Sequence, residues 1–241
     1  MDDSLYVCSP AGDEALRQLK RIFGYDSFRV GQREVIDLLM RGGPVLAVMP
    51  TGAGKSLCFQ LPAALSAGTA LVVSPLIALM KDQVDELDRL RIPSTFINSS
   101  ISYDEQRERL LAMKAGHYRL VYVAPERFRS PSFCRALEMT PIHTVAIDEA
   151  HCISEWGHDF RPDYLRLKDV LDSVRPKSII ALTATATPLV QTDILGHLGF
   201  PEAPRIITGF DRPNLRFAVR RFANESEKNP LLRQFLREHD G

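Results

Sequence analysis

A glycine-rich hexapeptide with one lysine and one hydroxyl residue, TGAGKS, occupies residues 51–56. Glycines let a backbone turn tightly and point successive N–H groups at phosphate oxygens. In such a loop a lysine reaches the β- and γ-phosphates of a nucleotide, and a serine hydroxyl binds Mg²⁺. The full pattern begins with glycine where this chain has Met49, so an ordinary strand–turn–helix connection is the alternative. The nucleotide-binding interpretation assigns Thr51, Gly52, Ala53, Gly54, Lys55 and Ser56 to the site.

A pair of acidic residues, Asp148 and Glu149, ends the apolar run VAIDE. A carboxylate at the end of a strand can hold the hydration shell of Mg²⁺, and its neighbour can orient or deprotonate an attacking water. The alternative is the acidic start of a helix, stabilised by the helix dipole. Because a phosphate loop precedes the pair on another inferred strand, the catalytic interpretation is favoured, with Ser56 and Asp148 as the metal-binding residues.

These side chains need a scaffold, and the chain supplies short apolar runs that alternate with helical patterns. Runs that are apolar throughout are typical of strands buried on both faces of a parallel sheet, with helices as crossovers. The six predicted strands lie at 44–50, 69–75, 94–99, 118–125, 143–149 and 178–185. The sequence thus predicts an α/β fold with a mostly parallel sheet and helices on both faces, whose ligands bind at the carboxyl ends of the strands.

Three of the crossover helices are clear, at 56–65, 76–91 and 103–116. Ser102 followed by Glu105 predicts a capping box at the start of the third. In the second, helical spacing predicts an inward-facing stripe. Its members are Leu76, Leu79, Met80, Val84, Leu87 and Leu90.

Composition narrows the class of protein. The chain is 45% hydrophobic and 25% charged, which is ordinary for a globular protein, and its longest apolar runs are too short to span a membrane. We therefore expect a cytoplasmic protein without a membrane partner. Thirty basic and thirty acidic residues cancel, so a local patch must carry any nucleic-acid binding. The four cysteines are scattered, which predicts reduced thiols and no zinc site; they are Cys8, Cys58, Cys134 and Cys152.

The only tryptophan, Trp156, lies just beyond the acidic pair in EAHCISEWGHDFRP. Lone tryptophans are usually core residues, because their large apolar area stabilises packing. Here the neighbours include Glu155 and Asp159, which suit a wet cleft better than a core. A core position stays the alternative.

The motifs TGAGKS, DEAH and TAT, in this order, resemble those of a superfamily 2 helicase motor. Further matches resemble one family, the RecQ-type DNA helicases, from about residue 14 onward, and in that superfamily Met49 is an accepted start of the phosphate loop. The matching segments are FGYDSFRVGQREVI at 23–36, SPLIALMKDQV at 74–84, VYVAPERF at 121–128, DEAHCISEWGHDFRPDY at 148–164, ALTATAT at 181–187 and FDRPNL at 210–215.

This resemblance implies roles for further residues. Tyr25 and Arg29 would flank an adenine while Gln32 pairs with its edge, and His151 would join Lys55 and the acidic pair in catalysis. Thr183 and Thr185 would link nucleotide state to domain movement. The expected DNA-binding and coupling set is Ser74, Pro75, Trp156, His158, Phe160, Arg161, Thr183, Thr185, Arg212 and Asn214. Within it, the segment around Trp156 is the family's sensor of single-stranded DNA, in agreement with base stacking on aromatic faces.

Residues 1–209 are then expected to form a first RecA-like motor domain, with PEAPRIITG as the boundary linker. Residues 210–241 are expected to be the incomplete start of a second, with its first strand in FDRPNLRFAVRRF and its first helix in NPLLRQFLREHDG. The resemblance implies a 3′-to-5′ DNA helicase that uses ATP and Mg²⁺ on single-stranded and partly duplex DNA, as a monomer. Without the arginine fingers of a complete second domain, we expect a fragment with little activity. The alternatives are a non-catalytic nucleotide- and strand-binding module, or an RNA helicase.

Overall fold

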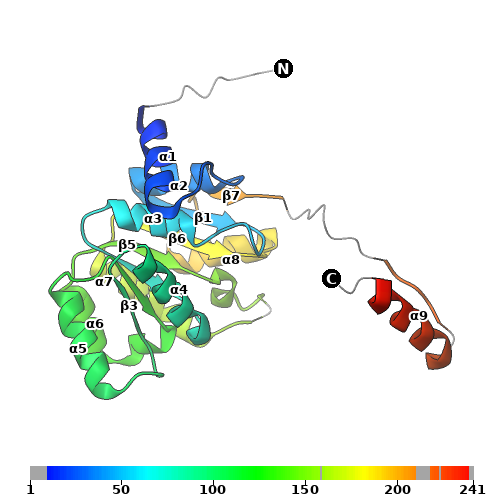
Figure 1. The fold of residues 1–241 in the computed structure, drawn as a ribbon. Coiled ribbons are helices and arrows are strands. Elements are labelled where there is room, and N and C mark those ends of the chain that lie inside the picture. The colour runs from blue at the N-terminus through cyan, green and yellow to red at the C-terminus, as the bar shows by residue number, and fades with distance from the viewer. Residues whose placement is uncertain (1–9, 158, 210–217, 223, 239–241) are drawn as a thin grey trace. The chain divides into compact units, whose positions relative to one another are not determined.

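The computed structural model describes residues 10–157, 159–209, 218–222 and 224–238. The chain divides into two compact units, residues 1–209 and residues 210–241. The first unit contains the sheet and both segments that the sequence singles out for chemistry (Figure 1). The expectation that the division separates two RecA-like domains remains a prediction.

The first unit is built on one parallel sheet of seven strands in the order β3-β4-β2-β5-β6-β1-β7. The strands are β1 (Gly43–Val48), β2 (Thr69–Val73), β3 (Ser94–Ile97), β4 (Leu120–Val123), β5 (Ile142–Ile147), β6 (Ser178–Thr183) and β7 (Arg205–Ile207). In the register, Val48 of β1 lies beside Thr183 of β6, and Val73 of β2 lies beside Ile147 of β5. The segments that follow these four strands therefore leave the sheet at one edge.

The α/β fold class and all six predicted strands are confirmed, and the structure adds β7. This strand pairs with β1 from within the segment that the sequence analysis assigned to a linker. Its three residues alternate between exposed and buried, which is typical of a short edge strand. The prediction missed it because it lacks the continuous apolar run that marked the other six.

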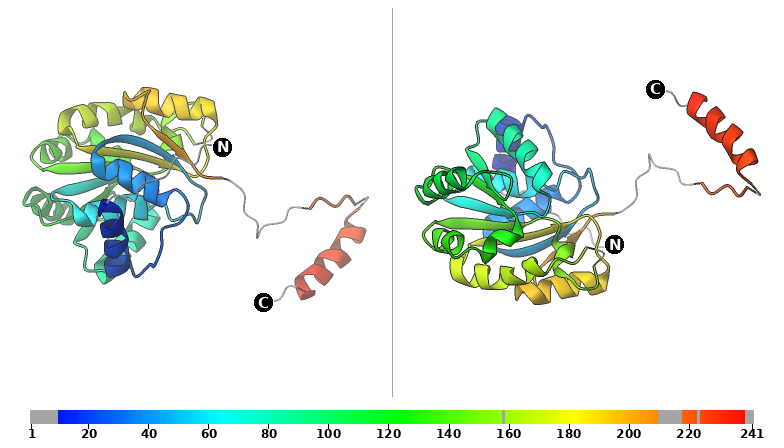
Figure 2. Two further views of the ribbon diagram at one scale, coloured as in Figure 1. Left: turned by 90° about the horizontal axis from the view of Figure 1, so that it is seen from above. Right: turned by 90° about the horizontal axis from the view of Figure 1, so that it is seen from below.

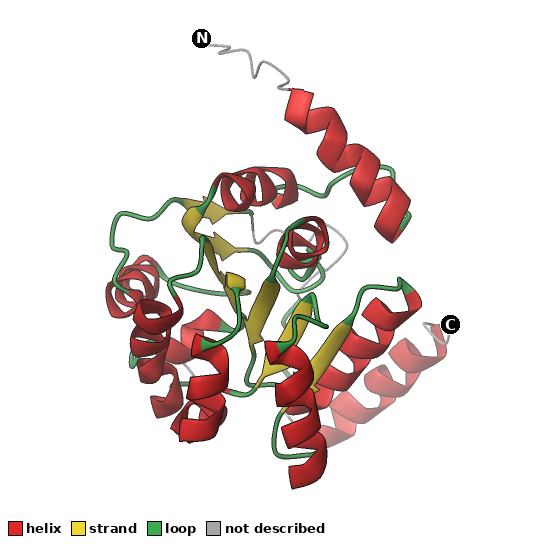
Figure 3. Ribbon diagram, turned by 90° about the vertical axis from the view of Figure 1, so that its left-hand side faces the viewer, coloured by secondary structure: helices red, strands yellow, loops and turns green. Residues whose placement is uncertain are grey.

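Helices cover both faces of the sheet, as Figure 3 shows for the strands enclosed between them. The face carrying β1 residues Val45 and Ala47 packs against α2, α3 and α4, and the opposite face packs against α5 to α8. In Figure 2, the left view has the yellow helix α8 on one side of the sheet and the blue α1 on the other. The helices are α1 (Pro10–Phe23), α2 (Gln32–Arg41), α3 (Leu57–Leu65), α4 (Ile77–Arg89), α5 (Tyr103–Lys114), α6 (Pro131–Glu138), α7 (Leu167–Val174) and α8 (Pro188–Leu198). The described residues of this unit also form three 3₁₀ turns, η1 (Pro125–Arg129), η2 (Ala150–Ile153) and η3 (Pro162–Arg166).

Two helical predictions have different outcomes. The capping box of α5 is confirmed, because the Ser102 side chain accepts from the Glu105 backbone N–H and Glu105 reaches back to the Ser102 backbone. The inward stripe of α4 holds for Met80, Val84 and Leu87, which are buried, and for Leu90, which is partly buried and packs against the same core. Leu76 and Leu79 were predicted to face the core and are exposed, Leu79 by 52%. Leu76 precedes the helix as its N-cap residue, and Leu79 lies outside the stripe that Ile77, Met80, Val84 and Leu87 form at helical spacing.

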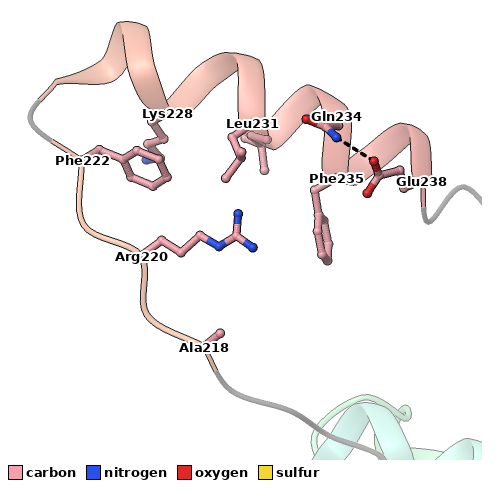
Figure 4. A pocket seen from close by; sticks show the side chains of 9 residues that line it. Ala218, Arg220, Phe222, Lys228, Leu231, Gln234, Phe235 and Glu238 are labelled. Atoms are coloured by element: carbon pink, nitrogen blue, oxygen red, sulfur yellow. Dashed lines mark hydrogen bonds between the residues drawn. The ribbon is translucent and has the colours of Figure 1, made fainter.

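The second unit contains α9 (Glu225–Glu238), which fits the helix expected at the start of another domain. The strand expected before it is absent from the described residues 218–222, and the rest of that segment, including Arg212 and Asn214, lies outside the described residues. Apolar side chains of α9 are exposed. Together with Arg220 and Phe222 they line a groove, which Figure 4 shows with Lys228, Leu231 and Phe235 on the helix.

Among the described helices, none combines the length and the apolar character that crossing a bilayer requires.

Candidate functional site: the carboxyl edge of the sheet

The glycine-rich loop turns from the end of β1 into α3, at residues 49–56. Gly54 has a φ of +77°, a backbone conformation that favours glycine, and an added Cβ would lie 2.5 Å from Gln32 Nε2. The ammonium of Lys55 donates to the Met49 carbonyl oxygen at 3.2 Å. The Lys55 ammonium is thus bonded to the first residue of its own loop. A phosphate that binds to Lys55 would have to replace the Met49 carbonyl oxygen as its partner.

The predicted adenine-binding residues lie together beside this loop. Tyr25, Arg29 and Gln32 line one cavity of 190 Å³, which also reaches Gly54 and Ser56. The Gln32 side-chain oxygen accepts from the Arg29 backbone N–H at 2.8 Å, which orients the amide.

This region is also tied to the phosphate loop. Gln32 Nε2 donates to the carbonyl oxygens of Ala53 and Gly54 at 3.1 and 3.0 Å, and the Arg29 guanidinium donates to the Gly52 carbonyl oxygen. The amide that is expected to read a base therefore already holds the phosphate loop. A base that bonds to Gln32 would compete with these hydrogen bonds. Binding of the base would therefore affect the loop that is expected to hold the phosphates.

The acidic pair follows β5 directly. The Asp148 backbone N–H donates to the Val73 carbonyl oxygen at 2.8 Å, which extends the β2–β5 pairing by one residue. The Ser74 hydroxyl donates to the Asp148 carboxylate at 3.3 Å, and the Tyr164 hydroxyl donates to the Asp148 carbonyl oxygen at 3.1 Å. Burial, together with the neighbouring Glu149 carboxylate, raises the pKa of Asp148 to about 6, although the Lys55 ammonium and the Ser74 hydroxyl act to lower it. A cation beside Asp148 would offset this cost.

Glu149 adopts a left-handed backbone conformation with a φ of +48°. Such a conformation is uncommon for residues other than glycine and is often found at functional sites. It ends the strand and begins η2, so that the side chains of Asp148 and Glu149 do not alternate as they would along a strand.

The next residues connect the acidic pair to the end of β6. His151 is buried, and its Nδ1 lies 3.0 Å from the Thr183 hydroxyl and 3.3 Å from the Glu149 carboxylate. The Thr183 hydroxyl in turn donates to the Thr185 carbonyl oxygen at 3.0 Å. The structure therefore brings together four predicted residues, Glu149, His151, Thr183 and Thr185, in one chain of contacts.

A small cavity joins the phosphate loop to the acidic pair. Its volume is 80 Å³, and Ser56, Ser74 and Asp148 line it. Hydroxyl and carboxylate oxygens are the ligand types that Mg²⁺ prefers. The donor set of Ser56 and Asp148 thus fits a magnesium ion bound with waters and phosphate oxygens.

The loop after the acidic pair presents Trp156 to solvent. Its side chain is 70% exposed, so the core alternative for this tryptophan is wrong. The loop beneath it is tight: the Gly157 backbone N–H donates to the Ser154 carbonyl oxygen at 3.0 Å, and a Cβ on Gly157 would collide with the His151 carbonyl oxygen. Trp156 is an exposed aromatic on a fixed base.

Arg161 anchors the far end of this loop. Its guanidinium pairs with Asp159 at 3.0 Å and donates to the Pro75 carbonyl oxygen at 3.4 Å, while its backbone N–H donates to the Cys152 carbonyl oxygen at 2.9 Å. Phe160 beside it is half-buried, and His158 lies outside the described residues. The Trp156 loop is thereby attached to the segment after β2, the other predicted strand-binding element.

His151, Cys152 and Asp159 have potential metal-ligand atoms within 4.8 Å of one another, which the sequence analysis did not anticipate. The Arg161 guanidinium already neutralises Asp159, and burial raises the pKa of the Cys152 thiol to about 12. The Asp159 carboxylate also accepts from the Cys152 thiol, so these contacts tie the two ends of the loop together.

Sequence reasoning also missed a buried polar group formed by Gln60, Gln83 and Tyr122. Gln60 Nε2 donates to both Gln83 Oε1 and the Tyr122 hydroxyl. A signal was present, because Gln60 is the only polar residue in the otherwise apolar stretch 57–65. A lone polar residue on a buried helix requires a hydrogen-bond partner.

Comparisons with known proteins agree with this geometry. Residues 29–193 match the family model described as DEAD/DEAH box helicase. The chain belongs to the DEAD/DEAH box helicase family.

Within this family, the chain resembles RecQ proteins. It is 47% identical over 205 residues to the ATP-dependent DNA helicase RecQ of Haemophilus influenzae, an alignment covering 85% of the chain and 33% of that protein. It is 49% identical over 203 residues to RecQ of Bacillus subtilis, covering 83% and 34%. The RecQ-type resemblance is confirmed, and the chain spans about a third of the length of these relatives.

The fold has solved counterparts as well. A hypothetical ATP-dependent RNA helicase from Sulfolobus tokodaii matches with a TM-score of 0.63 at 21% identity, over 81% of this chain and 57% of that one. At this identity the likeness concerns the fold alone, and it agrees with the predicted RecA-like architecture. By sequence, the chain is homologous to RecQ helicases.

Proposed function

We propose that this helicase chain is the ATP-binding motor domain of a 3′-to-5′ DNA helicase, which couples ATP hydrolysis to movement along single-stranded DNA. The observation that carries the proposal is the meeting of Ser56 and Asp148 at one cavity, next to Lys55 and Glu149. A phosphate-binding loop and a strained acidic turn at the same sheet edge are the two parts that nucleotide hydrolysis requires. The names of the RecQ relatives support DNA as the substrate.

The proposed nucleotide site uses the cavity beside α2. Tyr25 and Arg29 hold the base between a ring and a guanidinium, and Gln32 bonds to its edge. Lys55 leaves the Met49 carbonyl and pairs with the β- and γ-phosphates. The backbone N–H groups of Thr51 through Ser56 complete the phosphate cradle.

Magnesium fits the oxygens at the small cavity, where Ser56 and Asp148 would hold it. When bound, Mg²⁺ supplies charge stabilisation for the transferred phosphoryl group. Glu149 orients the attacking water and accepts its proton. His151, in contact with both Glu149 and Thr183, keeps that carboxylate in place and relays its position to Thr185 at the end of β6.

The proposed strand-binding surface combines the Trp156 loop with the segment after β2. Trp156 and Phe160 stack on bases, and Ser74, Pro75 and Arg161, of which Arg161 bonds to the Pro75 carbonyl, contact the DNA backbone. By resemblance alone, His158, Arg212 and Asn214 join this surface. We propose single-stranded and partly duplex DNA as the partners of a monomer that acts in the cytoplasm, where free thiols such as Cys58, Cys134 and Cys152 persist.

Steady-state ATP hydrolysis by the chain, with and without oligo-dT, tests the proposal. We expect weak Mg²⁺-dependent turnover, because the arginine fingers of a complete second domain are missing from this chain, and we expect it to rise when oligo-dT is added and to rise less with oligo-rU. No turnover in either condition, with ATP and oligo-dT both bound, would favour a nucleotide- and strand-binding module instead. A larger rise with oligo-rU would indicate an RNA helicase.

A further inference from the structure

Three elements meet at one buried amide, that of Gln60 on α3. Its side chain is only 6% exposed, and its Nε2 donates to Gln83 Oε1 on α4 at 3.1 Å and to the Tyr122 hydroxyl on β4 at 3.2 Å. The amide nitrogen carries two N–H donors, and this arrangement uses both.

Each amide belongs to an element next to a proposed ligand-binding segment. The Gln60 backbone N–H donates to the Ser56 carbonyl oxygen at 3.0 Å, so Gln60 continues the face of α3 that begins in the phosphate loop. Gln83 lies on α4, the helix that follows Ser74 and Pro75, and it lines the same small cavity as Ser74. A movement of the phosphate loop with α3, or of α4, would therefore displace one end of the Gln60–Gln83 hydrogen bond.

The same pair lies between two cavities. Gln60 and Gln83 line the 190 Å³ cavity that contains Tyr25, and Gln83 also lines the 80 Å³ cavity that contains Ser74 and Asp148. The link is thus in contact with the spaces on both sides, one assigned to the nucleotide base and the other to the acidic pair.

A hydrogen bond suits this place because it is sensitive to geometry. The remaining contacts of α3 are apolar, through Leu57, Cys58, Phe59 and Leu61 among others, and apolar surfaces tolerate small sliding movements. Hydrogen bonds weaken steeply as the angle and distance depart from their optimum. The Gln60–Gln83 hydrogen bond is therefore more sensitive than the apolar contacts to the position of α3 relative to α4.

We propose that Gln60 and Gln83 are positioning residues, whose hydrogen bond couples nucleotide binding at the phosphate loop to strand binding after β2. This inference rests on the proposed function and adds a physical connection between its two sites. Because coupling is reciprocal, each ligand changes the affinity for the other by one common factor.

The test measures that factor in the chain itself. The dissociation constant of a fluorescent mant-ADP is determined with and without saturating oligo-dT, and the ratio of the two values is the coupling factor. Because the readout is a ratio, a general weakening of nucleotide binding cancels. We expect a factor of about 10 in the parent chain, within the usual range for allosteric coupling.

Gln83→Met removes the acceptor and keeps the length of the side chain on a half-exposed helix position, so the variant should fold. We expect its coupling factor to fall to within about twofold of unity. Gln60→Met should do the same, and the double variant should show no further loss, because both act through one bond. Tyr122→Phe is the matched control: it removes the other partner of Gln60, keeps the α3–α4 bond, and should retain the parent's factor.

Each other result contradicts the inference. A parent chain that binds both ligands without coupling, or a Gln83→Met variant with unchanged coupling, shows that the bond is only structural. Equal loss in Tyr122→Phe indicates that the whole buried cluster, rather than the α3–α4 link, matters. A parent chain that binds neither mant-ADP nor oligo-dT contradicts the proposed function first, and the inference with it.

Discussion

The segment after β1 and the segment after β5 face the same edge of the sheet but are held in different ways. In the phosphate loop the groups that a ligand would use are already engaged: Lys55 bonds to Met49, and Gln32 and Arg29 bond to loop carbonyls. The described part of the segment 148–161 is held by its own backbone bonds and by contacts with other elements, and it leaves Trp156 exposed.

The two segments differ in how much they must rearrange when a ligand binds. Phosphate must displace internal hydrogen bonds of the loop, so part of its binding free energy is spent on opening that region. A DNA base would meet Trp156 already exposed on a fixed turn, with little rearrangement. We therefore expect substitutions in the first segment to act on nucleotide handling, and substitutions in the second to separate hydrolysis from strand sensing.

Glu149→Gln tests the second segment at its point of chemistry and should have the largest effect. The amide keeps the shape and loses the proton acceptor, so ATP turnover should fall by roughly 10² to 10⁴ while ATP still binds. Asp148→Ala should instead weaken Mg²⁺-dependent nucleotide binding. Turnover assays and mant-ATP titrations, with and without Mg²⁺, distinguish the two. Equal loss of nucleotide binding in both variants would favour one shared structural role.

Lys55→Ala tests the first segment. Removing the ammonium takes a charge from the β- and γ-phosphates, and ATP turnover should drop by about two orders of magnitude. Lys20→Ala is the matched control, since that lysine is exposed on α1 and pairs with Asp26. If Lys55→Ala hydrolyses ATP as fast as Lys20→Ala and the parent chain, Lys55 does not belong to the site.

Asp148→Asn sharpens the comparison through stability. The pKa of Asp148 in the folded state, about 6, lies above its ordinary value of 3.8, so the folded chain favours the protonated carboxyl. This contribution is complete below pH 3.8 and is lost as the pH rises through about 6. Without Mg²⁺, the neutral amide should therefore raise the free energy of unfolding at pH 7.5 by on the order of 2 kcal/mol, and by little at pH 4.

Urea unfolding in EDTA at the two pH values measures this difference. Asp85→Asn, which changes a carboxylate on the outer face of α4, should alter the free energy of unfolding by less than about 0.5 kcal/mol at both. If Asp148→Asn is less stable than the parent at pH 7.5, the folded state stabilises the ionised carboxylate of Asp148, and the raised pKa is contradicted.

Trp156→Ala should have the smallest effect on the protein and a selective effect on function. Base stacking contributes about 1 to 3 kcal/mol, so most of the stimulation of ATP turnover by oligo-dT should disappear while DNA-free turnover remains. The melting temperature should stay nearly unchanged, because an exposed side chain leaves no cavity. Tyr103→Ala, at an aromatic 79% exposed at the start of α5, is the control and should retain the stimulation.

The sequence predicted the parts of this molecule that repeat a simple physical pattern. Apolar runs such as 143–149 gave six strands, and the buried faces of the sheet required helices on both sides. The edge strand β7 escaped because three residues with one buried side chain carry no such pattern. Leu79 was misplaced because the apolar residues of α4 allow more than one stripe, and the one that packs against the core runs through Ile77 and Met80.

For the candidate site, residue types were predictable and contacts were not. Lys55 and Asp148 could be named from motifs, but Lys55 bonding to Met49 and Ser74 bonding to Asp148 depend on loop conformation. The Gln60–Gln83 link joins residues far apart in the sequence, on two helices whose relative position only the folded sheet determines.

The central claim is that a fixed, exposed Trp156 senses single-stranded DNA beside the acidic pair. Because Trp156 is the only tryptophan, the intrinsic fluorescence of the unmodified chain reports on it alone. The decisive measurement is a titration with oligo-dT, with strand binding followed independently by anisotropy of a labelled oligonucleotide. The account predicts emission typical of an exposed indole, quenched in parallel with binding. Emission that stays constant while anisotropy shows the strand bound would contradict it.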